Sequence, residues 1–376
     1  MKQPKNKKIL IAAGGTGGHL FPAQALADAL LKKEERMEVL FAGKGLTGNR
    51  YFHRDKFLFR DISSATPFSG NLAAIIRSLW GIVQGVRQAM LVLREFQPDL
   101  IVGFGSFHTF PVLVAALLKK IPIALFEPNS IPGKVNRLFS RFAVLSAVQF
   151  TEATHHMKGP TVEVSIPLWQ KGEHNNMKAE EARHYFGLKP DIATLLVFGG
   201  SQGASSINHI VCGALEAMQG RKKLQIIHVT GRSEDTVEVE NFYRKLGILA
   251  CVKDFETKMS CAWRAADFAI CRAGAATLGE LIAFEVPAIL IPFPRAADDH
   301  QTRNALFLEK YVHGGIHMPE ALLNVHKLSS ALELMLSSED SGIYAKRQAI
   351  RAFKAQKEKG DLCSVIHKLL QEPVFG

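Results

Sequence analysis

Two glycine-rich stretches, each between an apolar run and a helix-forming run, are the strongest chemical signals in the chain. The first is Gly-Gly-Thr-Gly-Gly-His (14–19) and the second is Gly-Gly-Ser-Gln-Gly (199–203). A glycine loop between a strand and a helix lets the backbone approach a phosphate, whose charge the helix N-terminus stabilises. The first stretch departs from the dinucleotide-binding pattern, because Leu20 stands where the third glycine belongs, and GxxxxGK[ST] is absent from the sequence. A nicotinamide enzyme and a P-loop NTPase are therefore disfavoured.

His19 directly follows the first glycine stretch, at the start of an expected helix. An imidazole accepts a proton near neutral pH, as the deprotonation of a sugar hydroxyl requires. We therefore predict that His19 is a catalytic base or an orienting group. The alternative, a histidine with only a structural role, stays open.

The segment from Cys271 to Glu280 combines a strand end, a turn of small residues and the start of a helix. One interpretation is a capping box, with Thr277 near the first turn and Glu280 reaching back to the helix start. The other is a turn whose backbone N–H groups hold a phosphate while Glu280 accepts hydrogen bonds from vicinal ribose hydroxyls. Capping alone does not explain a whole Gly/Ala turn at a strand end, so the nucleotide turn is favoured.

A loop dense in hydrogen-bonding side chains, residues 292–304, follows another expected strand. Sugar recognition needs such a cluster of neutral polar groups, although a merely solvated loop has a similar composition. The Asp-x-Asp pattern that often holds a divalent metal in nucleotide-sugar enzymes is absent from the sequence. We therefore expect no metal cofactor, and a departing nucleoside diphosphate that helix N-termini and loop amides stabilise.

The elements that position these residues alternate between strand-like and helix-like runs. Strands are expected at 8–13, 37–42, 99–103, 121–126, 193–198, 224–229, 250–253, 268–271 and 288–291, and helices at 22–33, 110–119, 204–218, 276–284 and 301–309. This alternation predicts an α/β fold with parallel sheets, and the repeated glycine turn predicts two Rossmann-like domains facing each other across a cleft. The expected domains are 1–165 and 166–376, with the C-terminal helix free to pack back on the first.

The excess of positive charge lies almost entirely in the first half of the chain. The 376 residues include 46 Lys and Arg against 35 Asp and Glu, a net charge of +11. Residues 1–168 alone hold 21 against 11, a net charge of +10. This asymmetry indicates a polyanionic partner for the first domain.

The run 71–96 has apolar residues at helical spacing over more than one narrow stripe. Such a helix either is buried on both faces or offers one face to a partner. A tryptophan flanked by arginines suits the boundary between water and an anionic membrane, whereas no nucleic-acid motif appears. The candidate membrane contacts are Ile75, Arg77, Leu79, Trp80 and Arg87.

The cysteines and the apolar runs bear on the cellular compartment. Five cysteines without a CxxC pair suit a reducing environment. No run has the composition of a signal peptide or a membrane span, since the longest apolar candidate, 100–118, is interrupted by glycine, proline and polar residues. We therefore expect a cytoplasmic protein.

In combination, these residues resemble the peptidoglycan N-acetylglucosaminyltransferases of glycosyltransferase family 28, which have the two-domain GT-B architecture. The similar motifs, in the order of the family, are GGTGGH (14–19), GFGSF (103–107), Glu-Pro-Asn (127–129), GGSQGA (199–204), CRAGAATLGE (271–280) and DDHQTRNA (298–305). The resemblance implies inverting transfer of GlcNAc from UDP-GlcNAc to the 4-hydroxyl of MurNAc in undecaprenyl-pyrophosphoryl-MurNAc-pentapeptide (lipid I). The product is lipid II, made at the cytoplasmic face of the bacterial inner membrane by a peripheral protein that cell-wall or division proteins could recruit.

The resemblance also implies roles for individual residues. His19 is the candidate catalytic residue, Asn129 and Gln301 resemble contacts to the donor sugar, and Ser201 resembles a phosphate contact. The other substrate-binding residues that it implies are Thr16, Gly17, Gly18, Gln202, Arg272, Ala275, Ala276, Thr277, Leu278, Gly279, Glu280 and His300. The family uses the UDP-sugar as its donor and is expected to need no cofactor.

Two departures from the family pattern affect expected donor contacts. Where the family has Asn-Pro-Val-Arg, this chain has Ile-Pro-Leu-Trp (166–169), and where it has His-Glu-Gln-Asn, this chain has Phe-Glu-Pro-Asn (126–129). Both suggest altered donor affinity rather than another reaction. The alternatives are a related GT-B enzyme acting on another lipid such as diacylglycerol, and an inactive homologue that serves as a scaffold.

Overall fold

The protein, seen in a computed structural model, folds into two compact units. The first unit comprises Met1–Trp169 and Lys359–Gly376, and the second comprises Gln170–Glu358. The structure describes residues 6–15, 17–65, 72–168, 177–200, 203–218, 224–337, 342–356 and 360–371. The end of the chain thus returns to the first unit.

The first unit is built on an eight-stranded parallel sheet with the strand order β14-β7-β6-β5-β4-β1-β2-β3. Its strands are β1 (Lys7–Ala12), β2 (Met37–Gly43), β3 (Leu58–Asp61), β4 (Leu100–Gly103), β5 (Ile123–Glu127), β6 (Leu145–Val148), β7 (Thr161–Ser165) and β14 (Gly360–Asp361). Its helices are α1 (Gly17–Lys33), α2 (Leu72–Phe96), α3 (Phe110–Lys119), α4 (Lys134–Phe139), α5 (Thr151–Thr154) and α14 (Leu362–Gln371).

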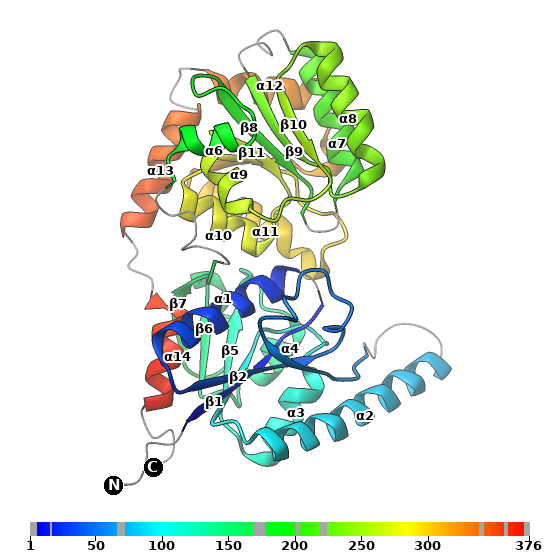
Figure 1. Cartoon of the computed structure of the whole chain (residues 1–376), viewed down its shortest axis with the longest axis vertical. Helices are drawn as coiled ribbons and strands as arrows, with labels where there is room; N and C mark the ends of the chain where they lie inside the picture. Colours follow the sequence, from blue (N-terminus) through cyan, green and yellow to red (C-terminus); the bar gives the residue numbers. More distant parts are fainter. Residues whose placement is uncertain are drawn as a thin grey trace. The chain divides into compact units, whose positions relative to one another are not determined.

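Helices cover both faces of this sheet, because its central strands are apolar on both sides. Leu10 and Ala12 of β1 belong to the core formed with α2, α3 and α4, while the alternate residues Ile9 and Ile11 are buried on the other face. In Figure 1, α1 and α14 lie on the opposite side of the sheet from α2 and α3. The Lys7 ammonium donates to the Leu370 carbonyl over 2.5 Å, which joins α14 to the start of β1.

The second unit has a six-stranded parallel sheet with the order β10-β9-β8-β11-β12-β13. Its strands are β8 (Ala193–Phe198), β9 (Leu224–Val229), β10 (Ala250–Lys253), β11 (Phe268–Cys271), β12 (Ala288–Leu290) and β13 (Gly315–His317). Its helices are α6 (Ala179–Tyr185), α7 (Ser205–Ala217), α8 (Ser233–Leu246), α9 (Met259–Ala265), α10 (Ala275–Phe284), α11 (His300–Lys310), α12 (Val325–Leu336) and α13 (Ile343–Gln356), with short 3-10 turns at Ala297–Asp299 and Glu320–Leu322. Its main core lies between the sheet and α7, α8 and α12.

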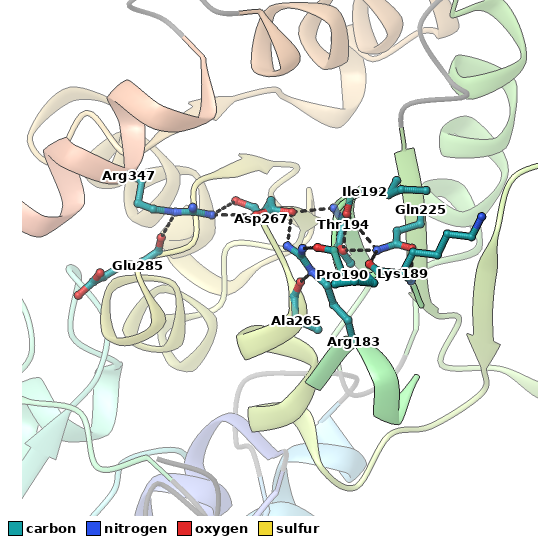
Figure 2. Close-up of polar contacts among 10 residues, drawn as sticks. All are labelled: Arg183, Lys189, Pro190, Ile192, Thr194, Gln225, Ala265, Asp267, Glu285 and Arg347. Atoms are coloured by element: carbon teal, nitrogen blue, oxygen red, sulfur yellow. Dashed lines mark hydrogen bonds and ion pairs between the residues drawn. The ribbon is translucent and has the colours of Figure 1, made fainter. Parts of the chain in front are cut away.

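A polar network joins α6 and α13 to the amino-terminal edge of this sheet (Figure 2). Asp267, just before β11, accepts hydrogen bonds from Arg183 of α6 over 2.7 Å and from the Thr194 N–H over 2.8 Å. Arg347 of α13 donates to the Asp267 carbonyl over 2.9 Å and to the Glu285 carbonyl over 3.2 Å. The network lies at the amino-terminal ends of the strands. The turns that contain the candidate site residues follow the opposite, carboxyl ends.

These observations confirm the predicted α/β class with parallel sheets. The helix expected at 22–33 differs at its start, because the chain completes its turn at Gly15, with a φ of 85°, and α1 already begins at Gly17. Pro22 therefore lies inside the helix. This earlier start places His19 in the first turn of α1.

Candidate functional site

The first glycine stretch leaves the carboxyl end of β1 in a turn that only glycine fits. Gly15 has left-handed backbone, and a Cβ on Gly14 would lie 2.7 Å from the Lys44 carbonyl oxygen. Asn49 fixes the turn, because its side-chain amide donates to the Gly15 carbonyl over 2.7 Å. Asn49 therefore holds the chain at Gly15, two residues before α1 begins.

The predicted residues of this stretch have different surroundings in the structure. Gly17 is buried, and a Cβ there would lie 2.8 Å from the Phe21 ring. Gly18 is exposed and His19 is partly buried. Thr16 lies outside the described residues. The first turn of α1 thus places a partly buried imidazole at the N-terminus of a helix, where the helix dipole favours negative charge.

The loop after β5 is organised around a buried carboxylate. Glu127 is 2% exposed, and its Oε1 accepts hydrogen bonds from the Asn129 backbone N–H over 2.9 Å and from the Asn129 side chain over 3.0 Å. Its Oε2 accepts from the Gly133 N–H over 3.0 Å and from the Asn136 amide over 2.9 Å. Burial raises the pKa of Glu127, and these hydrogen bonds oppose that shift. Glu127 therefore sets the position of the predicted sugar contact Asn129, a role that sequence reasoning did not assign.

Replacing Glu127 by glutamine should destabilise the protein. The new NH2 group would face the two N–H groups that donate to one of the carboxylate oxygens. A buried donor left unsatisfied costs about 1–3 kcal/mol. We expect the free energy of unfolding, measured by chemical denaturation, to fall by about 2–6 kcal/mol for the two donors involved. The matched control is Glu95→Gln on the exposed side of α2, and equal stability of the two variants would contradict this role.

The second glycine stretch leaves β8 in a similar turn. A Cβ on Gly199 would lie 2.4 Å from the Ala204 nitrogen, and a Cβ on Gly203 would lie 2.7 Å from the Thr230 carbonyl oxygen. The predicted residues Ser201 and Gln202 lie outside the described residues. The close approach of backbone on both sides explains the glycines and leads the chain directly into α7.

A buried network holds the start of α7. Asp235 accepts hydrogen bonds from the Ser205 hydroxyl over 2.7 Å and from the Asn208 amide over 2.8 Å. The Asn208 side chain also contacts His228 over 3.0 Å. Burial lowers the pKa of His228 to about 3, with the Asp235 charge opposing, so this imidazole is neutral at physiological pH. The first turn of α7 is thereby fixed to β9 and α8.

The turn after β11 is not a capping box. The N-cap of α10 is Gly274, which makes no side-chain cap bond, and Thr277 and Glu280 lie three and six residues further on. A capping box requires its glutamate three residues after the N-cap, so this alternative is wrong here. Ala276 and Thr277 are partly exposed in the first turn, whereas Ala275, Leu278 and Gly279 are buried. The first turn of α10 therefore follows directly on the glycine at the end of β11, and the dipole of the helix favours negative charge there.

Glu280 lies on α10 above the buried end of β11. Burial raises the pKa of Glu280 to about 7, and the neighbouring Trp263 indole opposes this shift. The residue is partly exposed, and hydrogen-bond donors such as hydroxyls would stabilise the charged form of its carboxylate.

Two side chains join the turn after β11 to the loop 292–304. Arg272 donates to the Ile291 and Pro292 carbonyls over 3.2 and 3.0 Å, and Asn304 of α11 donates to the Ala273 carbonyl over 3.1 Å. Arg272 also pairs with Glu320 over 2.5 Å. Burial acts to raise the pKa of Glu320, but the hydrogen bonds from Arg272 and Ser206 and the charge of Arg272 together outweigh it, so the pKa is lowered. Arg272 thus connects the end of β11 to the start of the loop 292–304 and to Glu320.

The loop 292–304 leads into α11 with its first residues oriented by hydrogen bonds. The Phe293 N–H donates to the Gln301 side-chain oxygen over 2.9 Å, and His300, the first residue of α11, is partly buried. The structure therefore brings together the second-unit residues 272–280, 300 and 301 at one sheet edge. In the first unit it places His19 and Asn129 at the carboxyl edge of the other sheet.

Helix α2 is buried on one face and exposed on the other. Gly85, Ala89, Val92 and Leu93 are buried, and a Cβ on Gly85 would lie 1.8 Å from the Ser63 carbonyl oxygen. The opposite face exposes a stripe at helical spacing, in which Trp80 is 65% exposed. The members of this exposed stripe are Ile76, Leu79, Trp80 and Val83, with Arg77 and Arg87 also exposed and Ile75 half-buried. Figure 1 shows the amino-terminal part of α2 reaching beyond the rest of its unit.

Within the described ranges, no group of three or more His, Cys, Asp or Glu side chains could hold a metal ion. None of the helices that the structure describes is long and apolar enough to cross a membrane. The candidate residues of the first unit are His19 and Asn129, and those of the second unit are Glu280, His300 and Gln301.

Comparison with known proteins gives matches along most of the chain. The model of the glycosyltransferase family 28 N-terminal domain matches residues 9–147, and that of the family 28 C-terminal domain matches residues 194–361. A protein from Protochlamydia amoebophila (strain UWE25) is 39% identical over 96% of this chain and 95% of its own length. One from Chlamydia felis (strain Fe/C-56) is 36% identical over 94% of this chain and 96% of its own length.

Both relatives are named UDP-N-acetylglucosamine--N-acetylmuramyl-(pentapeptide) pyrophosphoryl-undecaprenol N-acetylglucosamine transferase. Among solved structures, Acinetobacter baumannii MurG superposes with a TM-score of 0.72 at 24% identity, over 97% of this chain and 99% of that chain. The structural likeness supports a common GT-B fold.

Proposed function

The chain belongs to glycosyltransferase family 28, and on that premise we propose that it transfers GlcNAc from UDP-GlcNAc to the 4-hydroxyl of MurNAc in lipid I, giving lipid II. The observation that carries the proposal is the pair of glycine turns and helix N-termini at the carboxyl edges of two parallel sheets, in a chain with relatives of that name over nearly its whole length. The second unit holds the donor and the first unit holds the acceptor.

The donor contacts follow from the chemistry of the nucleotide sugar. N–H groups at the starts of α7 and α10 bind the diphosphate, and Glu280 accepts hydrogen bonds from the ribose hydroxyls. Gln301 and Asn129 contact the GlcNAc. Gly17, Gly18, Thr16, Ser201 and Gln202 are assigned to the phosphates by motif, and His300 and Arg272 border the sugar. The arginine that the family has at position 169 is replaced by tryptophan, outside the described residues.

The reaction is a single displacement with inversion. The 4-hydroxyl oxygen of MurNAc attacks the anomeric carbon of GlcNAc while the bond from that carbon to the UDP oxygen breaks. His19 takes the hydroxyl proton, and the leaving diphosphate keeps the electron pair. Because helix N-termini stabilise the leaving group, no metal ion is required.

The exposed stripe of α2 is proposed to attach the first unit to the cytoplasmic face of the inner membrane. Its apolar side chains enter the interface while Arg77 and Arg87 attract anionic headgroups, in a half of the chain with a net charge of +10. This arrangement brings the acceptor site to a lipid-linked substrate. Recruitment by cell-wall or division proteins is a further expectation.

Replacing Leu79 and Trp80 by glutamate should reduce membrane binding. Each of the two removes a large apolar side chain from the interface, and we expect the partition coefficient on vesicles with anionic lipid to fall about tenfold or more. Co-sedimentation with phosphatidylglycerol vesicles measures this. The control is Tyr344→Glu, at an exposed aromatic of the second unit. Equal binding of both variants would exclude the stripe as the membrane contact.

The proposed reaction is tested by UDP release from UDP-GlcNAc with purified protein. We expect release in the presence of a short-chain lipid I analogue, with or without EDTA, and none with diacylglycerol. Release with diacylglycerol alone would instead support the related lipid glycosyltransferase. UDP-GlcNAc binding without release with either acceptor would support a scaffold.

A further inference from the structure

The turn after β4 carries a serine and a histidine that the proposed mechanism does not use. Strands β1 and β4 are neighbours with Ala12 opposite Gly103, and the Phe104 N–H donates to the Ala12 carbonyl over 2.9 Å. The turn therefore lies beside the first glycine stretch. A Cβ on Gly15 would lie 3.0 Å from Nδ1 of His108, so the imidazole is packed against the glycine turn.

Ser106 holds this histidine at a cost in backbone strain. Its φ is 69°, in the left-handed region that favours glycine. The Thr109 hydroxyl contacts the carbonyls of Gly105 and Ser106, both over 3.0 Å, and so fixes the strained turn. Strained residues of this kind persist where the surroundings hold them, and they gather at functional sites. The strain here accompanies one specific contact, between Ser106 and His108.

The hydrogen bonds of Ser106 orient the His108 ring. Oγ of Ser106 accepts the His108 backbone N–H over 3.1 Å and lies 2.9 Å from Nδ1 of the same residue. We assign the Ser106 hydroxyl hydrogen to this second contact, which makes Nδ1 the acceptor. In a neutral imidazole the other ring nitrogen, Nε2, carries the hydrogen and is a donor.

The surroundings of His108 suit a negatively charged ligand. Burial lowers the pKa of His108, and the charge of Lys44 lowers it further, so the ring is neutral at physiological pH. Lys44 belongs to the same cluster, since its ammonium donates to the Ser64 carbonyl and the Ser64 hydroxyl donates to the Phe107 carbonyl, each over 2.5 Å. A cation, a neutral N–H donor and a glycine turn are thus gathered at one sheet edge of the basic half of the chain.

We propose that His108, oriented by Ser106 and with Lys44 beside it, donates a hydrogen bond to the diphosphate of the lipid acceptor. The inference rests on the proposed function, which gives the first unit an acceptor with a diphosphate. The donor diphosphate has its own turns in the second unit, so His108 acts on acceptor affinity and not on donor affinity. His108 is a binding residue in this account, and Ser106 is a positioning residue.

The test uses the full chain with three variants and a short-chain lipid I analogue. His108→Phe keeps a ring without an N–H donor, and Ser106→Gly removes the hydroxyl while relieving the backbone strain. We expect each to raise the acceptor KM about tenfold, as the loss of a hydrogen bond to a charged group does, and to change the UDP-GlcNAc KM less than about twofold. His108→Gln restores a side-chain N–H and should return the acceptor KM to within about threefold of the unaltered chain.

Ser106→Gly separates binding from stability. Because glycine suits a φ of 69°, its thermal unfolding temperature should equal or exceed that of the unaltered chain even as acceptor affinity falls. An unchanged acceptor KM in both His108→Phe and Ser106→Gly, or a rise in the donor KM alone, would overturn the inference. His156→Phe, at an exposed histidine of the same unit, is the control.

Failure of the proposed function gives a different pattern. Calorimetric titration of the unaltered chain with the lipid I analogue shows whether the acceptor binds. If it binds without being converted, the acceptor Kd of the variants replaces the acceptor KM as the measured quantity. If the unaltered chain neither binds nor converts the analogue, the proposed acceptor is wrong and the inference falls with it. If the unaltered chain does both and the variants match it, only the inference is wrong.

Discussion

Replacing His19 by alanine should lower kcat about 10²–10⁴-fold, the range that general base catalysis contributes, and leave UDP-GlcNAc affinity unchanged. The histidine lies in the first turn of α1, partly buried, directly after a glycine turn fixed by Asn49. Its position suits a group that takes the proton of the acceptor hydroxyl. The turns proposed to bind the donor lie in the second unit, so we expect the affinity for UDP-GlcNAc to stay the same.

The pH dependence of kcat gives the specific signature of a base. In the unaltered chain kcat should fall on the acidic side as the imidazole takes up a proton, and this limb should be absent in His19→Ala. His156→Ala is the matched control, since it removes an exposed imidazole from the same unit. Normal turnover with a normal pH profile in His19→Ala would show that His19 is not the base.

Replacing Glu280 by glutamine should raise the KM for UDP-GlcNAc about 10–100-fold, since hydrogen bonds from the ribose hydroxyls to a carboxylate are lost. The same change should stabilise the protein without nucleotide at alkaline pH. The pKa of Glu280 is raised from 4.5 to about 7 on folding. The folded state therefore favours the protonated form, and the associated stability is present below pH 4.5 and lost as the pH rises through 7.

Glutamine is neutral throughout this range, so it does not lose that stability. Without nucleotide, the thermal unfolding temperature of Glu280→Gln should thus be higher than that of the unaltered chain at pH 8. The difference between the two temperatures should shrink towards pH 5. Saturating UDP should reverse the order at pH 8, because only the carboxylate binds the ribose tightly. Equal KM values for the donor would remove Glu280 from the nucleotide site, whatever the effect on stability.

The sequence predicted most of the elements that carry the candidate site. The runs 110–119, 193–198, 224–229, 250–253 and 268–271 coincide with α3, β8, β9, β10 and β11. These are apolar runs bounded by glycine, proline or charged residues, which is the pattern of a buried strand or a core-facing helix. The α/β class followed from their alternation.

Strands with a weaker hydrophobic pattern were not predicted. Strands β3, β7 and β14 are short, at the edge of the sheet or next to it, and β14 has two exposed residues. Such strands acquire their conformation from pairing with a neighbour more than from their own residues. The sequence left open whether the C-terminal helix packs on the first unit, because this depends on contacts between residues more than 300 positions apart, such as Lys7 with Leu370.

The side-chain partners of the site were the least predictable part. Glycine turns can be predicted from a sequence, because few other residues adopt the backbone conformation of such turns. By contrast, Glu127 holding Asn129 and Ser106 holding His108 depend on exact distances across a turn. A glutamate before Pro-Asn and a histidine after a glycine turn were visible signals, but only the structure connects them to the site.

Transfer of radiolabelled GlcNAc distinguishes the lipid I acceptor from the alternatives. Purified protein would receive labelled UDP-GlcNAc with a short-chain lipid I analogue in one reaction and diacylglycerol in another. We expect label in the lipid I analogue alone, in a β-linked disaccharide formed with inversion. Label in diacylglycerol, or no label in either lipid while UDP-GlcNAc still binds, would contradict it.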